Sequence, residues 1–577
     1  MTIFCGAYSR DPQQALPDDL LNELRNNLSR TSSDQIIEYR SECAYSAYVD
    51  IGAFSGEAAL HEGDGSYTIV AGEPLLTDGD TNIEWNRSRD LEVLHPAFEV
   101  DRADAALRRA CGTFCGVHYN ARTTEMILFA DKMGVRPLYM WVGPQFVVFA
   151  TALRILEAVK QVPKRFDVRG VTEIAALSYP LADRTPYAGI SMLRAGDIVH
   201  LRSQGVRRLP YWRWDEQTEQ LDYEQATKRG YEAFINAIAR RQRRPGIAAA
   251  FLSGGLDSRV IVGGLAALGN QVHTVNYAPD GSQDQVFAKL VADQLGLRHT
   301  QIETNAENVN QGYRKDAVSA WIRTTFPNGK PPVLWSGDGG SVGLGHVYMT
   351  PQIVAEMERG TIPAAVALFT QGIPQRIIKR SCLGQVSDLT AQGVEEELAA
   401  IRSPDPGRQF HLFLMFNDQR RHLAQHFEDI DVERIEFHLP FFDAAFLESV
   451  LRLPNEWLMG HQYYMDWMKH FPNGLDNIPW QAYPDHVPCT LPSPPGLKYQ
   501  WDVYYDKKMY AQMRRNLAAA GHRMLAAPRF PDHLISRPVL RVASMLTGTG
   551  LRDYSYLIKT AGIYQRYWAV TEDQQVH

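Results

Sequence analysis

Six residues near the middle of the chain combine glycines, hydroxyl groups and a carboxylate: residues 253–258 have the sequence Ser-Gly-Gly-Leu-Asp-Ser. An apolar run at 247–252 precedes them and a helix-forming run at 259–268 follows, so we predict a turn between a buried strand and a helix. The first turn of a helix offers N–H groups without partners and a partial positive charge, which suit a phosphate. Asp257 would repel that phosphate unless a divalent cation lay between them. The stretch therefore predicts a site for a pyrophosphate group and Mg²⁺.

This glycine-rich stretch is not a P-loop, because it lacks the Gly-Lys-Ser/Thr ending of that motif. Gly254 and Gly255 let the backbone approach a phosphate closely, and Ser253 and Ser258 add hydroxyl donors. The alternative is a plain strand-to-helix turn with an Asp and Ser cap and no ligand, because glycine-rich turns are common.

The elements that position these residues fall into two parts. A length of 577 residues suggests two to four domains. The first third contains short apolar runs at 67–72, 125–130 and 145–150 that predict strands, with helices predicted at 17–29 and 152–159. We expect an α+β domain over residues 1–215 and a second domain over 216–577, whose first long helix begins near residue 216 and reaches about residue 240.

The second part alternates strand and helix, which indicates a parallel sheet. After the strand at 247–252 and the helix at 259–268, we predict a strand at 272–277 and a helix at 283–295. Beyond about residue 353 the pattern becomes mostly helical.

Residues 253–258 after an apolar strand resemble the pyrophosphate loop of ATP pyrophosphatases, and the chain as a whole resembles the asparagine synthetase family. The resemblance implies an N-terminal-nucleophile (Ntn) hydrolase-like α+β sandwich, followed by an α/β parallel-sheet ATP pyrophosphatase domain with a helical C-terminal part. It implies a C–N ligase that adenylates a carboxylate with ATP, releases AMP and pyrophosphate, and forms an amide with an amine.

The resemblance also implies the site residues that hold the nucleotide and the metal. The expected nucleotide-binding residues are Leu252, Ser253, Gly254, Gly255, Asp257, Ser258, Val275, Asn276 and Gly337. Asp257 and Asp338 are the expected Mg²⁺ ligands. Ser341 stands where the family has a second metal-binding Asp, so either Asp338 takes over the cation or the second contact passes through water.

Two catalytic residues follow from the same resemblance. Glu436 matches the active-site glutamate of the family, and His438 replaces its usual Arg. An ordinary surface carboxylate is the alternative for Glu436. The family also brings a Lys to the polyphosphate from a late loop, for which Lys498 is the first candidate and Lys469 the second.

The front domain keeps part of a glutaminase pattern, because residues 112–115 and 131–139 resemble glutaminase segments. An active glutaminase needs Cys at the mature N-terminus, where the free amine serves as the base. Here four residues precede Cys5, the segment 71–73 lacks the Asn that holds the oxyanion, and no Arg-Gly-Pro-Asp stretch is visible. We therefore predict that glutamine is not hydrolysed and that Cys5 is structural.

Several functions remain open. Asparagine synthesis is the default for the family, whereas relatives with decayed glutaminase domains include β-lactam synthetases and lasso-peptide macrolactam cyclases, which use a substrate amine. A non-catalytic nucleotide-binding scaffold is a third alternative. The expected partners are a small-molecule or peptide carboxylate, including a precursor peptide, and the resemblance leaves a homodimer open.

Composition bounds the remaining possibilities. The formal net charge is −7 and Lys and Arg form no basic run, so no nucleic-acid partner is expected. The six cysteines are scattered, which disfavours zinc. No apolar stretch reaches about 18 residues and no signal peptide precedes residue 6, so we expect a cytoplasmic protein without a membrane partner.

Overall fold

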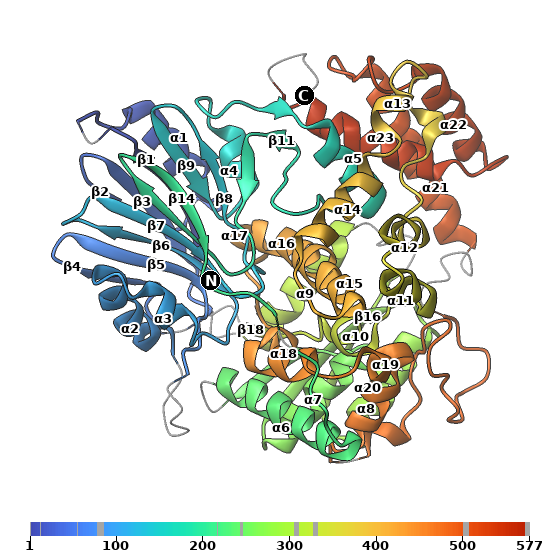
Figure 1. Cartoon of the computed structure of the whole chain (residues 1–577). Helices are drawn as coiled ribbons and strands as arrows, with labels where there is room; N and C mark the ends of the chain where they lie inside the picture. The colour runs from blue at the N-terminus through green and yellow to red at the C-terminus, as the bar shows by residue number, and fades with distance from the viewer. Residues whose placement is uncertain are drawn as a thin grey trace.

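The computed structural model describes residues 2–11, 13–54, 56–77, 86–215, 217–242, 246–304, 311–326 (backbone alone for 311–316), 333–472, 474–499 and 507–571. The chain combines antiparallel sheets in its first part with a parallel sheet and many helices in its second (Figure 1). Within the described ranges, no helix has the length and apolar character that crossing a bilayer requires.

Two six-stranded antiparallel sheets form the first part. The first contains, in spatial order, β12 (Ile190–Met192), β8 (Tyr139–Val142), β9 (Phe146–Ala150), β1 (Thr2–Ser9), β3 (Ala44–Asp50) and β2 (Ile37–Arg40). The second contains β14 (Gly205–Pro210), β13 (Asp197–Arg202), β7 (Glu125–Ala130), β6 (Phe114–Asn120), β5 (Ser66–Gly72) and β4 (Leu60–Gly63). The strands predicted at 67–72, 125–130 and 145–150 are confirmed as β5, β7 and β9.

The two sheets face each other across an apolar layer and carry helices on their outer faces. Phe4 and Tyr8 of β1 share a buried cluster with Ile69 of β5 and Val117 of β6. Helix α1 (Asp18–Leu28) packs on the first sheet, and α2 (Arg87–Glu99) with α3 (Ala103–Leu107) on the second. The short elements α4 (Leu153–Ala158), β10 (Arg165–Phe166), α5 (Val168–Leu177) and β11 (Tyr187–Ala188) follow. The predicted helices at 17–29 and 152–159 correspond to α1 and α4.

A five-stranded parallel sheet forms the centre of the second part. Its spatial order is β17 (Arg298–Glu303), β16 (Gln271–Ala278), β15 (Ile247–Phe251), β18 (Val333–Trp335) and β19 (Glu436–His438). The connecting helices include α7 (Asp257–Ala267), α8 (Gln283–Gln294) and α9 (Gln311–Thr325). The chain proceeds outward from β15 to β17 on one side and then returns to β18 on the other. Such a reversal opens a crevice at the carboxyl ends of the strands.

The expected start of the first long helix near residue 216 is wrong. Helix α6 runs from Tyr223 to Arg241, and residues 217–222 before it are not helical. The side chain of Asp222 accepts a hydrogen bond from the Gln225 N–H and thereby caps the helix.

The rest of the chain is mostly helical, as predicted. After α10 (Gly340–Gly345) come α11 (Pro351–Glu358), α12 (Ile362–Phe369), α13 (Leu383–Val386), α14 (Leu389–Ala400), α15 (Pro406–Leu414), α16 (Arg420–Glu428), α17 (Ile430–Glu433), α18 (Ala444–Leu451), α19 (Asn455–Leu458), α20 (Gln462–Met468), α21 (Lys507–Ala526), α22 (Arg537–Thr549) and α23 (Ser555–Trp568).

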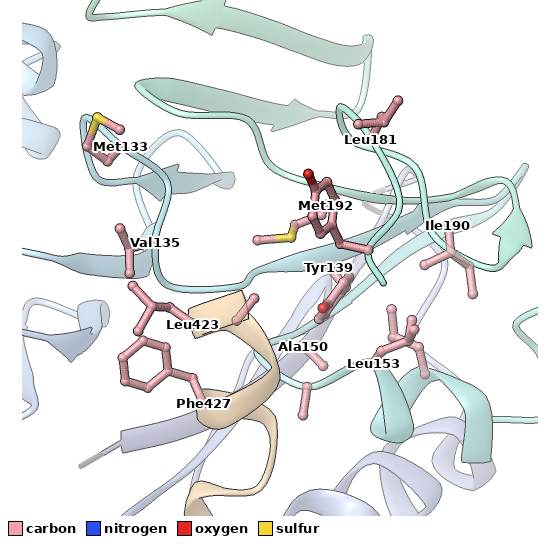
Figure 2. Close-up of a cluster of buried hydrophobic side chains, with 14 of the residues drawn as sticks. Met133, Val135, Tyr139, Ala150, Leu153, Leu181, Ile190, Met192, Leu423 and Phe427 are labelled. Carbon is pink, nitrogen blue, oxygen red and sulfur yellow. The ribbon is translucent and has the colours of Figure 1, made fainter. Parts of the chain in front are cut away.

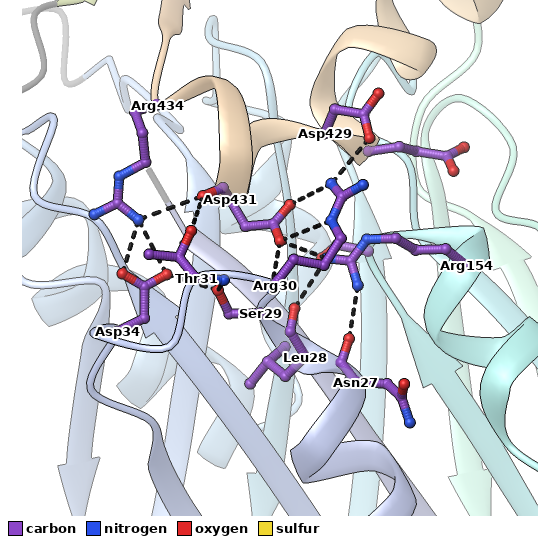
Figure 3. Close-up of polar contacts among 12 residues, drawn as sticks. Asn27, Leu28, Ser29, Arg30, Thr31, Asp34, Arg154, Asp429, Asp431 and Arg434 are labelled. Carbon is purple, nitrogen blue, oxygen red and sulfur yellow. Dashed lines mark hydrogen bonds and ion pairs between the residues drawn. The ribbon is translucent and has the colours of Figure 1, made fainter.

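Helices α16 and α17 join the two parts of the molecule. Leu423 and Phe427 of α16 pack against Met133 and Val135 of the front part (Figure 2). A second contact is polar: Asp431 of α17 accepts hydrogen bonds from the Arg30 main chain and guanidinium, with Arg154 3.1 Å from its Oδ2 (Figure 3). Burial alone would raise the pKa of Asp431, but Arg30 and Arg154 outweigh it and hold that pKa below its usual value. The carboxylate thus stays ionised and ties α17 to the front part.

Candidate functional site

The turn after β15 is held in place by a carboxylate from the next helix. The Gly254 N–H donates to Asp284 Oδ1 at 2.7 Å, and a Cβ on Gly254 would lie 2.8 Å from the Asp284 main chain. Asn276 Nδ2 donates to Leu252 O at 2.8 Å and to Asp284 Oδ2 at 3.1 Å. Asp284 and Asn276 therefore shape the turn from behind, and glycine is required at 254 because the backbones touch.

The two serines of the turn bind each other across it. The Ser253 N–H donates to Ser258 Oγ at 2.8 Å, and the two hydroxyl oxygens are 2.9 Å apart. This pairing bends the chain so that α7 begins at Asp257, two residues earlier than predicted. Asp257 consequently lies in the first helical turn, beside the N–H groups that favour an anion.

Asp257 is half-buried and its hydrogen-bond donor is neutral. Ser341 donates its N–H to Asp257 Oδ2 at 3.0 Å and its hydroxyl to Oδ1 at 2.8 Å. Loss of water around the carboxyl raises the pKa of Asp257 to about 6, although Ser341 lowers it, and the nearby charge of Asp338 adds to the rise. A raised carboxyl pKa means that the ionised form lacks a positive charge beside it. The site therefore fits a cation.

The second glycine-rich segment packs directly on the first turn of α7. A Cβ on Gly337 would lie 2.6 Å from the Ser258 nitrogen, and one on Gly340 would lie 2.6 Å from Asp257 Cγ. Asp338 is exposed and accepts a hydrogen bond from Ser336 Oγ at 2.5 Å. Among the described residues no group of three or more Asp, Glu, His or Cys could hold a metal. A Mg²⁺ ion here would thus depend on two carboxylates, with phosphate oxygens and water completing its shell.

A cavity of about 680 Å³ opens where the carboxyl ends of β15, β16 and β18 meet these loops. Ser253, Asp257, Ser258, Gly337 and Asp338 all line it, so five predicted residues are brought together. Its volume lies within the range of small-molecule sites. Aromatic side chains form much of the remaining wall, namely Phe251, Tyr277, Tyr348, Phe437 and Tyr483.

Other predicted nucleotide residues lie behind this surface. Leu252, Val275 and Asn276 are buried at 1%, 1% and 3% exposure and do not line the cavity. Gly254 is buried against Asp284, and Gly255 donates its N–H to Ser253 Oγ at 3.3 Å. Their contribution is to shape the turn.

The structure places Glu436 away from the cavity. Its neighbours Ile435 and Phe437 line the cavity, whereas the Glu436 side chain points to the opposite face of β19. There its carboxylate is fully buried and ion-paired with Arg136 of the front part, so the alternative of a surface carboxylate is wrong. His438 lies on the same face, with its Nδ1 3.1 Å from Glu73 Oε1.

A different carboxylate, Glu433 at the end of α17, lines the cavity. Its Oε2 lies 3.1 Å from Nδ1 of His426, whose ring stacks on Phe437 at a centroid distance of 3.9 Å. Nε2 of His426 is 3.1 Å from Ile435 O, and because a carbonyl oxygen only accepts, Nε2 carries a hydrogen. Neither residue belongs to a motif. The one signal for Glu433 is its position three residues before Glu436, across a turn in which Arg434 has a φ of 58°.

Neither candidate lysine lines the cavity. Lys498 is exposed, but its main chain lies beside the start of α8: its N–H donates to Gly281 O at 3.1 Å and its carbonyl accepts from Gln283 N at 2.8 Å. Lys469 is exposed and binds Asp466 of the same helix at 2.7 Å. Lys498 is thus near the helix that carries Asp284, and Lys469 is held by its own helix.

Cys5 lies inside the central strand of the front sheet. It pairs with Ala47 of β3 and Ala150 of β9, and its thiol donates to Leu24 O at 3.6 Å. Complete burial raises the pKa of Cys5 strongly, which disfavours the nucleophilic thiolate. The preceding residues 2–4 are 0 to 2% exposed, so they are part of the core strand. A free amine at Cys5 would require removal of the first three of the eight residues of β1.

Comparisons with known proteins agree with this two-part arrangement. Residues 76–212 match the family described as "Glutamine amidotransferase domain" and residues 230–328 the family described as "Asparagine synthase". The first match lies in the front part, and the second begins within α6 and includes β15, β16 and β17. Both matches are similarities over parts of the chain, and proteins named asparagine synthetases are among those that it resembles.

Individual relatives share only part of their length with this chain. A putative glutamine-hydrolysing asparagine synthetase of Methanocaldococcus jannaschii is 28% identical over 226 residues, which are 38% of this chain and 44% of that protein. Asparagine synthetase 3 of Bacillus subtilis is 24% identical over 227 residues, 37% and 36% of the two chains. Carboxyethyl-arginine β-lactam-synthase of Streptomyces clavuligerus is 26% identical over 234 residues, 38% and 43%. The chain therefore spans less than half the length of these relatives.

Among solved structures, a glutamine phosphoribosylpyrophosphate amidotransferase from B. subtilis gives a TM-score of 0.24 at 10% identity and covers 59% of this chain and 82% of that one. An NMN synthetase from Francisella tularensis gives 0.19 at 12% identity, with 36% and 97% covered.

Proposed function

We propose that this chain is an ATP-dependent C–N ligase, which adenylates a carboxylate, releases pyrophosphate and then transfers the acyl group to an amine. The observation that carries the proposal is Asp257, a carboxylate without a positive neighbour in the first turn of α7, at the wall of the cavity. The likeness to proteins named asparagine synthetases and a β-lactam-synthase supports the reaction class.

The finer fold assignment is part of this proposal. We assign the front part to the Ntn-hydrolase-like sandwiches and the second part to the ATP pyrophosphatase domains. Two antiparallel sheets packed face to face support the first, and the strand order around β15 supports the second. The boundary near residue 216 stays a prediction, and the two family matches end at 212 and begin at 230.

In the first step a carboxylate oxygen would attack the α-phosphorus of ATP, and the bond to the β-phosphate oxygen would break. The charge that develops on pyrophosphate would be received by the N–H groups of the first turn of α7 and by the hydroxyls of Ser253 and Ser258. Asp257 and Asp338 would hold Mg²⁺, which offsets phosphate charge when bound. The partly buried Ser253–Ser258 pair is already fixed in position, so little reorganisation would be needed.

In the second step an amine would attack the acyl carbonyl, and AMP would leave with the electrons of the broken C–O bond. The attacking nitrogen loses a proton, which needs a base at the cavity wall. Glu433, bound through Oε2 to His426, is a carboxylate that faces this space. We assign it this role, with His426 as the positioning residue. The catalytic role predicted for Glu436 would require Arg136 to release it first.

The nitrogen source is proposed to be an amine other than ammonia from glutamine. Burial of Cys5 and of residues 2–4 supports this, because the thiol is inside the sheet and the nitrogen of Cys5 is a peptide nitrogen within β1 rather than a free amine. Ammonia from solution is the first candidate. An amine carried by the substrate, as in a ring closure, is the second, and the likeness to the β-lactam-synthase favours it. A peptide precursor, a homodimer and a cytoplasmic location remain predictions.

The test is pyrophosphate release from ATP with purified full-length protein and Mg²⁺. Candidate acids are aspartate with glutamine or with ammonium, N-carboxyethyl-arginine, and peptides with an acidic side chain and a free N-terminus. Products are identified by mass spectrometry. Asp257→Asn serves as the control, because it should abolish release with every acid that is active.

Each outcome separates the candidates. Asparagine from aspartate with glutamine would refute our nitrogen source, whereas asparagine with ammonium only would support it. A cyclised product that has lost one water would favour the substrate amine. ATP binding without pyrophosphate release by any acid would favour the nucleotide-binding scaffold and overturn the ligase proposal.

A further inference from the structure

The last three helices carry a strong local excess of positive charge. Between residues 507 and 571 there are eleven Lys and Arg against two Asp and no Glu, whereas the whole chain has 59 Lys and Arg against 66 Asp and Glu. The longest basic runs there, 507–508 and 514–515, have only two residues, so the excess forms no basic motif. Because α21, α22 and α23 pack on one another, the fold gathers these charges into one basic unit (Figure 1).

A groove of about 750 Å³ lies on this unit, between α22 and residues 375–383. Ile378, Ala543 and Leu557 line it and are each at most 4% exposed, so its floor is apolar and recessed. Two main-chain hydrogen bonds connect the segments that form its walls: the Lys379 N–H donates to Leu534 O at 2.8 Å, and the Ser536 N–H donates to Ile377 O at 2.9 Å. The groove is thus preformed, and none of its lining residues belongs to the candidate active-site cavity.

Charged and apolar side chains are segregated on its two walls. One wall presents Arg376, Lys379 and Arg380, none of which has an ion-pair partner among the residues that the structure describes. No Asp or Glu among the described residues lines the groove. The other wall is α22, where Val542 is 50% exposed and Met545, one turn further, 53%. Exposed apolar side chains of this size beside a pocket mark an interaction site.

The chemistry of the walls limits what could bind. A flat anionic membrane would meet the cations but leave the recessed floor empty, and nucleic-acid phosphates would leave both the floor and Val542 uncovered. A polypeptide segment that combines apolar side chains with Asp or Glu satisfies both walls. The acidic remainder of the chain would repel such a segment elsewhere, so the basic unit would also steer it to the groove.

We propose that the groove between α22 and residues 375–383 docks an acidic segment with apolar anchors, contributed by a partner polypeptide. The apolar anchors enter the floor at Leu557 and Ala543, and carboxylates pair with Arg376, Lys379 and Arg380. This surface is separate from the proposed ligase site and does not depend on it.

The probe is a fluorescein-labelled 18-residue peptide with Leu at helical i, i+3, i+4 and i+7 positions and Glu on the opposite face. A matched peptide has Lys in place of every Glu. Binding to the full-length protein is followed by fluorescence anisotropy at about 50 and 200 mM NaCl. We expect the Glu peptide to bind and to weaken with salt, and the Lys peptide not to bind. Equal binding of the two peptides would overturn the proposal.

Two triple variants, each with three cations replaced by Glu, test whether the peptide binds in the groove. Reversal of the rim by R376E, K379E and R380E should weaken the Glu peptide about tenfold, because each exposed ion pair contributes only a few-fold. The control reverses three cations of α21 outside the groove, by R514E, R515E and R523E.

The control should lower affinity less than threefold. Similar losses of affinity in both triple variants would mean diffuse attraction to the basic unit and would refute binding in the groove.

Val542→Asp tests the apolar wall with a single exposed substitution, and it should weaken binding of the Glu peptide at least fivefold. Thermal unfolding confirms that each variant is folded. Vesicles of phosphatidylserine and phosphatidylcholine, and a single-stranded RNA, are tested as competitors. If either competitor displaces the Glu peptide from the wild type at a concentration that does not displace it from the control variant, the proposal of a polypeptide partner is overturned.

Discussion

Replacing Asp257 by Asn should stabilise the free protein and abolish its response to Mg-ATP. The carboxyl pKa rises from 3.8 to about 6 in the folded state. At 1.36 kcal/mol per unit, the ionised form costs the folded protein up to about 3 kcal/mol above pH 6. Asn removes this cost. Its amide nitrogen, however, faces a donor of Ser341, and the hydrogen bond lost there lowers the gain in stability by about 1 kcal/mol. The net gain is about 2 kcal/mol.

The sign of the pH dependence follows from the raised pKa. Below pH 3.8 the carboxyl is protonated in both states and costs nothing, whereas the penalty builds as pH rises through 3.8 to 6 and is complete above 6. Between pH 4.5 and 7.5 the wild type should therefore lose about 2 kcal/mol relative to Asp257→Asn. Unfolding of a chain of 577 residues carries an entropy of about 1.2 kcal/mol/K, so the loss corresponds to about 2 °C in the unfolding midpoint.

Differential scanning calorimetry of both proteins across this pH range measures the effect. Asp338→Asn is the matched control: Asp338 is exposed and its charge is the smallest of the causes that shift the pKa of Asp257, so its removal should move the midpoint of the free protein much less than Asp257→Asn does. Mg-ATP at about 100 times its dissociation constant should stabilise the wild type by about 2.7 kcal/mol, and Asp257→Asn hardly at all. Parallel pH curves for wild type and Asp257→Asn would refute the electrostatic argument. A full Mg-ATP shift in Asp257→Asn would refute the metal site.

Three further substitutions separate the roles of neighbouring residues. Glu433→Gln should keep pyrophosphate release within about threefold but lower amide formation about 100-fold, and equal losses in both steps would contradict its role as base. Glu436→Gln should lower the unfolding midpoint by about 3 °C, because it leaves the buried Arg136 guanidinium without a counter-charge at a cost of about 3–5 kcal/mol. Loss of amide formation at an unchanged midpoint would instead support a catalytic role. Ser341→Asp should destabilise the free protein by placing two carboxylates together, and millimolar Mg²⁺ should restore its unfolding midpoint. An unfolding midpoint that does not change with Mg²⁺ would exclude a cation at this position.

The sequence predicted the secondary structure well where hydrophobic period and turn residues agreed. The strand at 247–252 and the helix at 259–268 are present, but α7 begins at Asp257 because Leu256 already has helical angles, φ −84° and ψ −41°. The helix predicted from residue 216 begins only at Tyr223. Within a polar run of similar residues, nothing in the composition singles out Asp222 as the cap.

The site was predicted in its parts but not in its orientation. Glycine and hydroxyl spacing was enough to place Ser253, Asp257 and Ser258 around one cavity. The direction of Glu436 depends on the phase of a three-residue strand and on Arg136, three hundred positions earlier, and no local pattern records either. Glu433 reaches the cavity only because the chain turns at Arg434 with a positive φ, which a sequence pattern for helices does not predict.

The burial of Cys5 and the position of Glu436 have a common consequence for the front part. Its strand β1 keeps the Cys5 thiol buried, and its other segments supply contacts on which the second part depends. Glu73 lies 3.1 Å from His438 and 3.6 Å from Arg241, which in turn binds Asp443 at 2.8 Å. Glu73, Arg241 and Asp443 are buried, so losing one of these three charges leaves the others uncompensated at a cost of several kcal/mol. The front part therefore positions β19 and the loop after it, and substitutions there should change the candidate active-site cavity even though no described residue of the front part lines it.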